Sequence, residues 1–412
     1  MYKRYECPNC DFYEIARYDL HREKCPACGH RYHVFEEEIE DERYSWLFDI
    51  VKNHFSFENF IIRKDSFLFI GSMISDFATI KKAFEDMKYY PFIREKNGRV
   101  YLHLFKAREK GKSRKVLPIV LLVATIASVF YAGFSWAGPM KEMGYINNTW
   151  LTSLAFMVGL ITILGCHEMG HKITAIKNNI DASWPHFIPL PISPIGTMGA
   201  VISIKSPIPT KKAAIRLGLS GPVVGFVLSI VVLSIGMMIS PVVPTAEYAE
   251  AAEAFDTAHP EGYSVGFGNT LTFMILRELL VDVPQGYTWV MHPLVIAGII
   301  GIFVTALNLI PMGQLDGGHI ARSILGERYH MVLSKSISFG LLGVGLAGRF
   351  LGYHVWIGWI IWGFVGYFMA SRGHPGAMDE VTPLTSENKL LALIGILIFI
   401  LCFTPTPIYV IP

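Results

Sequence analysis

The sequence predicts a polytopic α-helical membrane protein of six or seven transmembrane helices, with a soluble N-terminal zinc ribbon and a small α+β domain before the first span. Three observations lead to this prediction. Hydrophobic residues make up 52% of the 412 residues, more than an ordinary soluble enzyme contains. Several uncharged runs reach the length of about 20 residues that a transmembrane helix needs. Four of the six cysteines lie within the first thirty residues.

The N-terminal cysteines form two C-x-x-C pairs separated by fourteen residues. Two thiolates of one pair can bind the same metal ion, and this spacing is typical of a four-thiolate zinc ribbon. We therefore predict a structural zinc site in residues 1–35, held by Cys7, Cys10, Cys25 and Cys28. A redox-active dithiol remains the alternative. Clustered cysteines of this kind indicate a reducing compartment.

The segment that follows the ribbon, "EEEIEDE" at residues 36–42, is strongly acidic, and the net charge of the chain is +2. Both features argue against a nucleic-acid partner and favour a protein-contact or regulatory role for the ribbon. The first residues, "MYKRYECPNCDFYE", have the character of neither a signal peptide nor a transit peptide. We therefore expect the N-terminus to lie in the cytoplasm.

Residues 43–112 are predicted to form the small α+β domain. "YSWLFDIVKNHF" and "DFATIKKAFEDM" have the periodicity of amphipathic helices. "SFLFIG" and "RVYLHLF" have the composition and alternation of strands.

The remainder of the chain, residues 116–412, is predicted to be the membrane-spanning domain. The uncharged runs lie at residues 116–138, 144–166, 217–246, 283–315, 350–371 and 390–412. A further stretch, residues 333–350, is interrupted only by Lys335 and Arg349. The count of spans is therefore six or seven.

The charges of the connecting loops predict the orientation of these spans. Six Lys or Arg residues precede the first span, and the loop 174–216 has five basic residues and one acid. The loop 241–290 has seven acids and one basic residue. Because basic loops favour the cytoplasmic side, we expect a multi-pass protein of the cell membrane whose loop 174–216 and whose Asp316 lie on the cytoplasmic side.

The motif "HEMGH" at residues 167–171 ends one of the apolar runs. On a helix, His167 and His171 share one face, so both imidazoles can bind one zinc ion. Glu168 would then be the general base that takes a proton from a zinc-activated water. A pair of structural histidines near the membrane interface is the alternative, although ionisable groups in a membrane helix usually mark a functional site.

A third zinc ligand is expected from the segment "ALNLIPMGQLDGGHIA", residues 306–321. Asp316 is the first carboxylate after a long uncharged run, and the predicted topology puts it on the same side as the histidines. It could instead simply end a helix before two glycines. Asn308, about two turns earlier, could donate a hydrogen bond to a developing oxyanion or join neighbouring helices.

These motifs resemble the site-2 protease family of intramembrane zinc metalloproteases. "HEMGH" (167–171) and "NLIPMGQLDGGH" (308–319) carry the resemblance, and "PLPISPIGTMGAVISIKS" (189–206) and "HPGAMDEVTPL" (374–384) are similar to the plant-chloroplast and cyanobacterial-type branch. The resemblance implies His167, His171 and Asp316 as zinc ligands, Glu168 as the base and Asn308 as an active-site residue. The N-terminal cysteine module departs from the family's usual pattern.

The resemblance implies an endopeptidase that cuts membrane-anchored proteins in or near their transmembrane segments, within the lipid bilayer. Six prolines between Pro185 and Pro209 exclude a regular helix there, and "GTMGAVISI" (196–204) is predicted to be a strand. Gly196 and Gly199 would let an unwound substrate approach its edge, unless this segment is only a bent interfacial loop.

Two other functional classes compete with the protease. A zinc transporter would use the same ligands as a transit site, but its polar residues should continue through both halves of the bilayer. A non-catalytic scaffold would have lost Glu168 or a ligand, and none is lost. The sequence leaves the substrate and the oligomeric state open.

Overall fold

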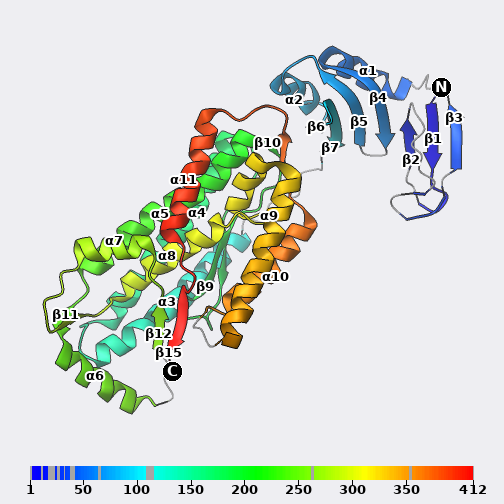
Figure 1. The fold of residues 1–412 in the computed structure, drawn as a ribbon. Helices are drawn as coiled ribbons and strands as arrows, with labels where there is room; N and C mark the ends of the chain where they lie inside the picture. The colour runs from blue at the N-terminus through cyan, green and yellow to red at the C-terminus, as the bar shows by residue number, and fades with distance from the viewer. Residues whose placement is uncertain are drawn as a thin grey trace. The chain divides into compact units, whose positions relative to one another are not determined.

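The chain folds into two compact units (Figure 1). The first comprises residues 1–112, 207–211 and 376–384, and the second comprises residues 113–206, 212–375 and 385–412. Two short segments expected in the membrane-spanning domain therefore group with the N-terminal part. The computed structural model describes residues 2–10, 13–16, 24–25, 28–31, 33–37, 42–63, 66–107, 116–260, 264–351 and 355–411.

The first unit is built on a nine-stranded sheet in the order β10-β14-β6-β7-β5-β4-β2-β1-β3. Its N-terminal strands are β1 (Tyr2–Glu6), β2 (Tyr13–Ala16) and β3 (His33–Glu37). The central strands are β4 (Phe55–Arg63), β5 (Ser66–Met73), β6 (Tyr89–Lys96) and β7 (Arg99–Lys106). The helices are α1 (Glu42–His54) and α2 (Phe77–Glu85). The expected amphipathic helices and strands of residues 43–112 are all present.

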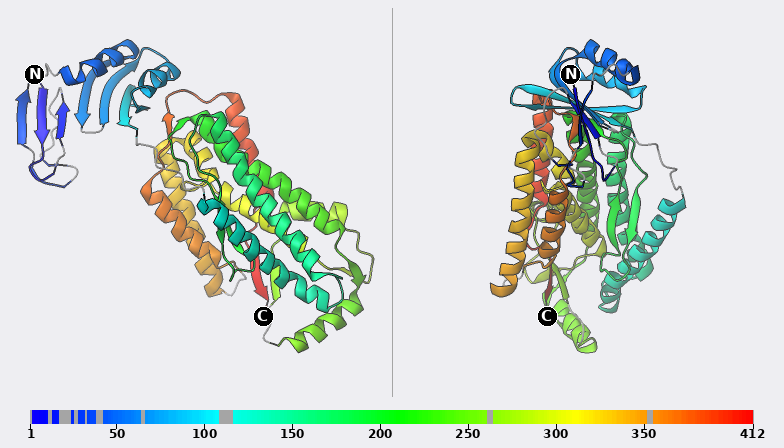
Figure 2. Two further views of the ribbon diagram at one scale, coloured as in Figure 1. Left: turned by 180° about the vertical axis from the view of Figure 1, so that it is seen from behind. Right: turned by 90° about the vertical axis from the view of Figure 1, so that its right-hand side faces the viewer.

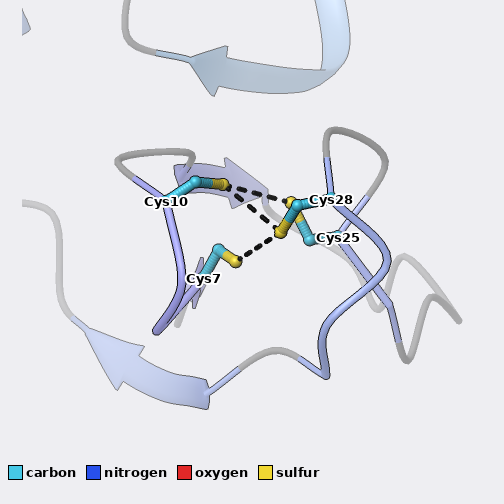
Figure 3. A group of neighbouring side chains, drawn as sticks. All are labelled: Cys7, Cys10, Cys25 and Cys28. Atoms are coloured by element: carbon cyan, nitrogen blue, oxygen red, sulfur yellow. Dashed lines mark hydrogen bonds between the residues drawn. The ribbon is translucent and has the colours of Figure 1, made fainter.

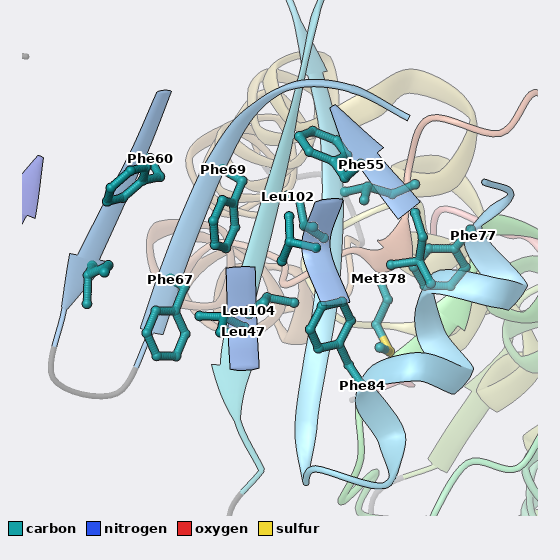
Figure 4. Packing of buried hydrophobic residues seen from close by; sticks show 14 of the residues in the cluster. Leu47, Phe55, Phe60, Phe67, Phe69, Phe77, Phe84, Leu102, Leu104 and Met378 are labelled. Carbon is teal, nitrogen blue, oxygen red and sulfur yellow. The ribbon is translucent and has the colours of Figure 1, made fainter. Parts of the chain in front are cut away.

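An aromatic core joins the two helices to the sheet (Figure 4). Leu47 of α1 and Phe84 of α2 are fully buried against Phe55, Phe69 and Leu102 of the strands. The buried residues Phe67 and Phe69 of β5 lie two apart, as do Leu102 and Leu104 of β7, which is the spacing that gives a strand one apolar face. Burial of these large side chains is the main force that holds the unit together.

Two short strands from distant parts of the sequence complete this sheet. β14 (Ala377–Asp379) pairs in parallel with β6 and also with β10 (Ile208–Thr210). Arg94 of β6 donates a hydrogen bond to the carbonyl of Met378 at 3.1 Å and forms a 3.2 Å ion pair with Glu380. The carboxylate of Asp379 accepts hydrogen bonds from two backbone amides just beyond it, so this side chain stabilises the turn after β14.

The second unit is mainly helical, and its long helices run side by side (Figure 2). Within the described residues, four helices are long and apolar enough to cross a membrane. These are α3 (Val116–Glu142), α4 (Thr149–Lys177), α5 (Lys211–Met238) and the part of α9 from Asp316 to Gly348. Four of the expected spans thus have counterparts of spanning length.

Three further expected spans coincide with helices of 15 to 17 residues. They are α8 (Pro293–Leu309), α10 (Gly358–Arg372) and α11 (Ser386–Cys402). The full α9 runs from Asp316 to Leu351 and is broken at Gly326, where the backbone is not helical. The total of six or seven spans stays a prediction, since these three helices are shorter than the other four.

Several expected apolar runs are longer than the helices that form. In the run 217–246 the helix ends at Met238, and in the run 390–412 it ends at Cys402. Prolines explain both ends, because they lack the amide that a helix requires. The released segments form small sheets: β11 (Val242–Pro244) with β13 (Tyr287–Trp289), and β12 (Ser264–Phe267) with β15 (Ile408–Ile411). Helices α6 (Thr245–Ala258) and α7 (Leu271–Leu280) lie between these strands in sequence.

The proline-rich segment between α4 and α5 contains a short irregular hairpin. β8 (His186–Pro189) pairs antiparallel with β9 (Thr197–Val201), with a register shift between Phe187 and Pro189. An isolated bridge between Ala182 and Ile204 extends the pairing beyond the strands. The expected strand within residues 196–204 is therefore present.

Candidate metal centre

Three predicted metal ligands from two helices meet inside the second unit. His167 and His171 lie one turn apart on α4, and Asp316 is the first residue of α9. The Nε2 atoms of the two histidines stand 3.4 and 3.2 Å from Oδ2 of Asp316. The ligand atoms of all three residues lie within 4.8 Å of one another. This is the donor set of two imidazoles and one carboxylate that a catalytic zinc ion binds.

The backbone around the ligands controls their orientation. Nδ1 of His171 lies 2.8 Å from the carbonyl oxygen of Leu217 on α5. Because a carbonyl can only accept, this nitrogen carries the proton and leaves Nε2 with its lone pair toward Asp316. Such a second hydrogen bond is the usual means by which a protein orients a metal-binding histidine. The residues therefore fit a metal ion at this position.

Two further predicted residues lie beside the ligands. Nδ2 of Asn308, near the end of α8, is 3.3 Å from Nε2 of His167. Glu168 is buried next to His167 on α4. Glu168, Asn308, His171 and Asp316 all line one cavity of about 180 Å³. A carboxylate, an amide donor and the metal ligands thus share a space large enough for water and a small part of a substrate.

Helix α5 makes room for the imidazoles through glycines that none of the predicted motifs includes. A Cβ atom on Gly221 would overlap the ring of His171, and one on Gly225 would lie 2.8 Å from Nδ1 of His167. Gly218 packs equally closely against the backbone of Asp316. The signal was present in the sequence: glycines at 218, 221 and 225 share one helix face, as small residues do where membrane helices approach closely.

The β8–β9 hairpin provides one wall of the cavity. Ala200, Val201, Ile202 and Ile204, at the end of β9 and just after it, line the same space as Glu168. Among the described residues β9 pairs only with β8, so its second edge carries no strand. A Cβ atom on Gly199 would meet nothing within 4 Å, whereas Gly196 packs against the backbone of α3 at Ser128 and Val129.

The N-terminal cysteines form the second candidate metal site, shown in Figure 3. The sulfur atoms of Cys7 and Cys28 are 3.3 Å apart, and Cys10 lies 3.7 Å from Cys25 and 3.6 Å from Cys28. A tetrahedral zinc ion with Zn–S bonds of about 2.3 Å spaces its sulfurs by roughly 3.7–3.8 Å. The four thiols are therefore close to the geometry of one bound zinc ion.

The local backbone also favours a thiolate at this site. A hydrogen bond from the backbone of His30, aided by Cys7, lowers the pKa of Cys28 to about 6. Thiolates rather than thiols bind zinc. The lowered pKa is therefore compatible with the predicted zinc ribbon, and also with the redox-active dithiol that is its alternative.

A pair of histidines lies near the catalytic cavity without joining the ligand set. His319 of α9 lines the cavity, and its Nδ1 is 3.0 Å from Nε2 of His374. The only groups of three or more potential ligands in the described part of the chain are the two given above. Cys166, next to His167, and the buried Cys402 belong to neither group.

The comparisons with known proteins agree with this geometry. Residues 155–351 match the model of peptidase family M50. The chain is 25% identical to the rice "Probable zinc metalloprotease EGY1, chloroplastic" over 305 residues, covering 74% of the chain and 49% of the relative. It is 28% identical to the Arabidopsis protein of the same name over 258 residues, covering 62% of the chain and 43% of the relative.

A third relative, the "Probable zinc metalloprotease EGY3, chloroplastic" of rice, is 27% identical over 299 residues, or 70% of the chain and 47% of the relative. The chain thus spans about half the length of the curated relatives it matches. No solved structure shows significant similarity to it. The matched region contains HEMGH, Asn308 and Asp316, and the resemblance to site-2 proteases is confirmed: residues 155–351 of this chain are a peptidase family M50 domain.

Proposed function

We propose that this protein is an intramembrane zinc endopeptidase that hydrolyses peptide bonds in or near the transmembrane segments of membrane-anchored proteins. The observation that carries the proposal is the meeting of His167, His171 and Asp316 on apolar helices of membrane-spanning length, with Glu168 beside them. Buried ionisable groups of this kind are costly in a membrane and are retained for function.

A zinc ion bound by these three residues would supply Lewis-acid activation of water and of the scissile carbonyl. Glu168 accepts the proton of the attacking water and delivers it to the leaving amine as the C–N bond breaks. Asn308 donates from Nδ2 to the carbonyl oxygen as negative charge develops there. The cavity they share gives both side chains access to the same peptide bond.

The second edge of β9 offers a way to hold the substrate. Backbone amides of a transmembrane helix are bonded within the helix, so the segment must unwind before a carbonyl can be attacked. An unwound segment can pair with an exposed strand edge through its main chain. The position of β9 in the wall of the cavity that contains Glu168 supports this mode of substrate binding.

The location and the additional domains are part of the same proposal. The charge bias of the loops supports a cell-membrane protein with its N-terminus and catalytic site on the cytoplasmic side. The partners would be membrane-anchored protein substrates and the lipid bilayer, with no nucleic acid. The two zinc ions would be one catalytic ion and one structural ion in the ribbon.

The test is Glu168→Gln in the full chain, reconstituted with a panel of tagged single-span membrane proteins. We expect the variant to retain its catalytic zinc and to lose cleavage of any reporter that the wild type cuts. Glu142→Gln is the matched control, because Glu142 is an exposed carboxylate paired with His259 at 3.1 Å. Undiminished cleavage by the Glu168 variant would rule out its role as the base.

A further inference from the structure

The tip of the β8–β9 hairpin is bonded to helix α3. The hydroxyl of Ser128 donates to the carbonyl of Gly196 at 2.6 Å. The indole Nε1 of Trp136 donates to the carbonyl of Pro194 at 2.7 Å. Irregular backbone at membrane depth is stable only where protein or water satisfies it. The carbonyl of Gly196 also accepts from the amide of Leu190 at 3.1 Å, so Ser128 adds a second bond there, while Trp136 satisfies the carbonyl of Pro194.

Close backbone packing reinforces these bonds. Gly196 has a φ of +79°, and a Cβ atom there would lie 2.6 Å from both the carbonyl oxygen of Ser128 and Cα of Val129. Ser128 itself is buried. The turn and the helix are thus in direct main-chain contact, and a displacement of α3 must displace the tip of the hairpin.

The base of the hairpin is held by apolar packing. Phe187 is buried in one cluster with Val129 and Ala132 of α3. Beside it lies an open apolar groove of about 430 Å³, lined by Ile119 of α3 and by Trp184, just before β8, both more than half exposed. Packing at the base and hydrogen bonds at the tip therefore hold the hairpin against α3 together.

The same hairpin reaches the catalytic residues at its other end. Ala200 on β9 pairs with Phe187 on β8, and Ala200, Val201 and Ile202 line the cavity together with Glu168. The five residues of β9 connect Gly196 to Ile202. The position of the tip consequently sets where the cavity-lining edge stands relative to Glu168.

We propose that Ser128 and Trp136 are positioning residues through which α3 holds the β8–β9 hairpin and sets the strand edge that pairs with the substrate. This inference rests on the proposed function for its catalytic consequence. The structural part, the attachment of the hairpin to α3, does not depend on peptidase activity.

The experiment compares Ser128→Ala, Trp136→Phe and the double variant in the full chain. Hydrogen–deuterium exchange of residues 190–202 is measured first. Loss of one buried hydrogen bond typically changes a local opening equilibrium by roughly fivefold to tenfold. We expect exchange to accelerate by that factor in each single variant and further in the double variant, with zinc content and the exchange of α8 unchanged.

Matched controls use the same substitutions where no bond to the hairpin exists. The hydroxyl of Ser135 donates to Tyr131 within α3, and Trp150 of α4 is exposed and contacts Phe130 and Phe134. Ser135→Ala and Trp150→Phe should leave the exchange of residues 190–202 at the wild-type rate. Wild-type exchange in the double variant, or equal acceleration in the controls, would overturn the attachment.

Cleavage of a single-span reporter then tests the catalytic consequence. We expect KM to rise about fivefold or more in the double variant while kcat stays within about twofold, since the strand edge rather than the metal centre is disturbed. An unchanged KM alongside faster exchange would overturn the positioning role. If no reporter is cut even by the wild type, the proposed function fails while the exchange result still decides the attachment.

Discussion

Gly221 of α5 lies directly against the imidazole of His171, so closely that a Cβ atom would overlap the ring. The same imidazole is bonded through Nδ1 to the carbonyl of Leu217 at 2.8 Å. One short stretch of α5 therefore determines both the space for a metal ligand and its orientation.

This contact predicts that Gly221→Ala displaces His171 and abolishes binding of the catalytic zinc. The helix itself favours alanine over glycine by roughly 1 kcal/mol, so any loss of zinc must come from the crowding of the ring. Metal analysis of the purified chain should find about one zinc fewer than in the wild type. Gly340→Ala is the control, because a Cβ atom there meets nothing within 4 Å.

The two metal sites predict a simple zinc stoichiometry. The wild-type chain should hold about two zinc ions, one with three protein ligands and one with four. His171→Ala should leave about one, Cys10→Ser combined with Cys25→Ser should leave about one, and the triple variant none. Metal analysis after gel filtration measures this directly. A wild-type chain with a single zinc that only the cysteine changes remove would exclude the catalytic zinc site.

Asn308 offers a test of transition-state stabilisation that is separate from metal binding. Removal of an oxyanion donor typically lowers kcat by about 10²–10³. We expect Asn308→Ala to lose activity in this range with KM little changed and the catalytic zinc retained. Loss of the zinc instead would mean that the 3.3 Å contact with His167 serves to hold the ligand.

His103 in β7 predicts a pH dependence of the first unit. Burial, with a smaller contribution from Arg94 and Arg63, lowers the pKa of His103 to about 4. The unfolded chain binds this proton at an ordinary pKa of about 6.5, so stability is complete above pH 6.5 and falls as the pH drops toward 4. The expected loss is about 2 kcal/mol at pH 5.

The measurement for His103 is the exchange of β5, β6 and β7 amides at pH 7 and pH 5, corrected for intrinsic rates. His103→Gln should remove most of the difference between the two pH values. His54→Gln is a suitable control, since His54 lies at the end of α1 and contacts the hydroxyl of Ser75. This control should keep the difference between the two pH values. A pH effect of equal size in the His103 variant would assign it to other groups.

The sequence by itself determined the parts of this protein that depend on local spacing. His167 and His171 share a helix face because they are four residues apart. The two cysteines of each C-x-x-C pair can bind the same ion because only two residues separate them. The apolar runs predicted where helices form, since hydrophobicity over about 20 residues is a property of one segment. The prediction of Asp316 as the third zinc ligand depended on the charge-based topology and on the resemblance to a family.

Tertiary structure decided what depends on contacts between distant segments. Gly221 and Gly225 of α5 matter only because α4 packs against them, and Gly218 only because α9 does. Ser128 and Trp136 matter only because a hairpin more than fifty residues later lies against α3. β10 and β14 are three residues each, too short for a periodic pattern, and become strands because they pair with each other and β14 also pairs with β6. Local periodicity carries no record of such pairings, because their free energy arises only when the chain brings the partners together.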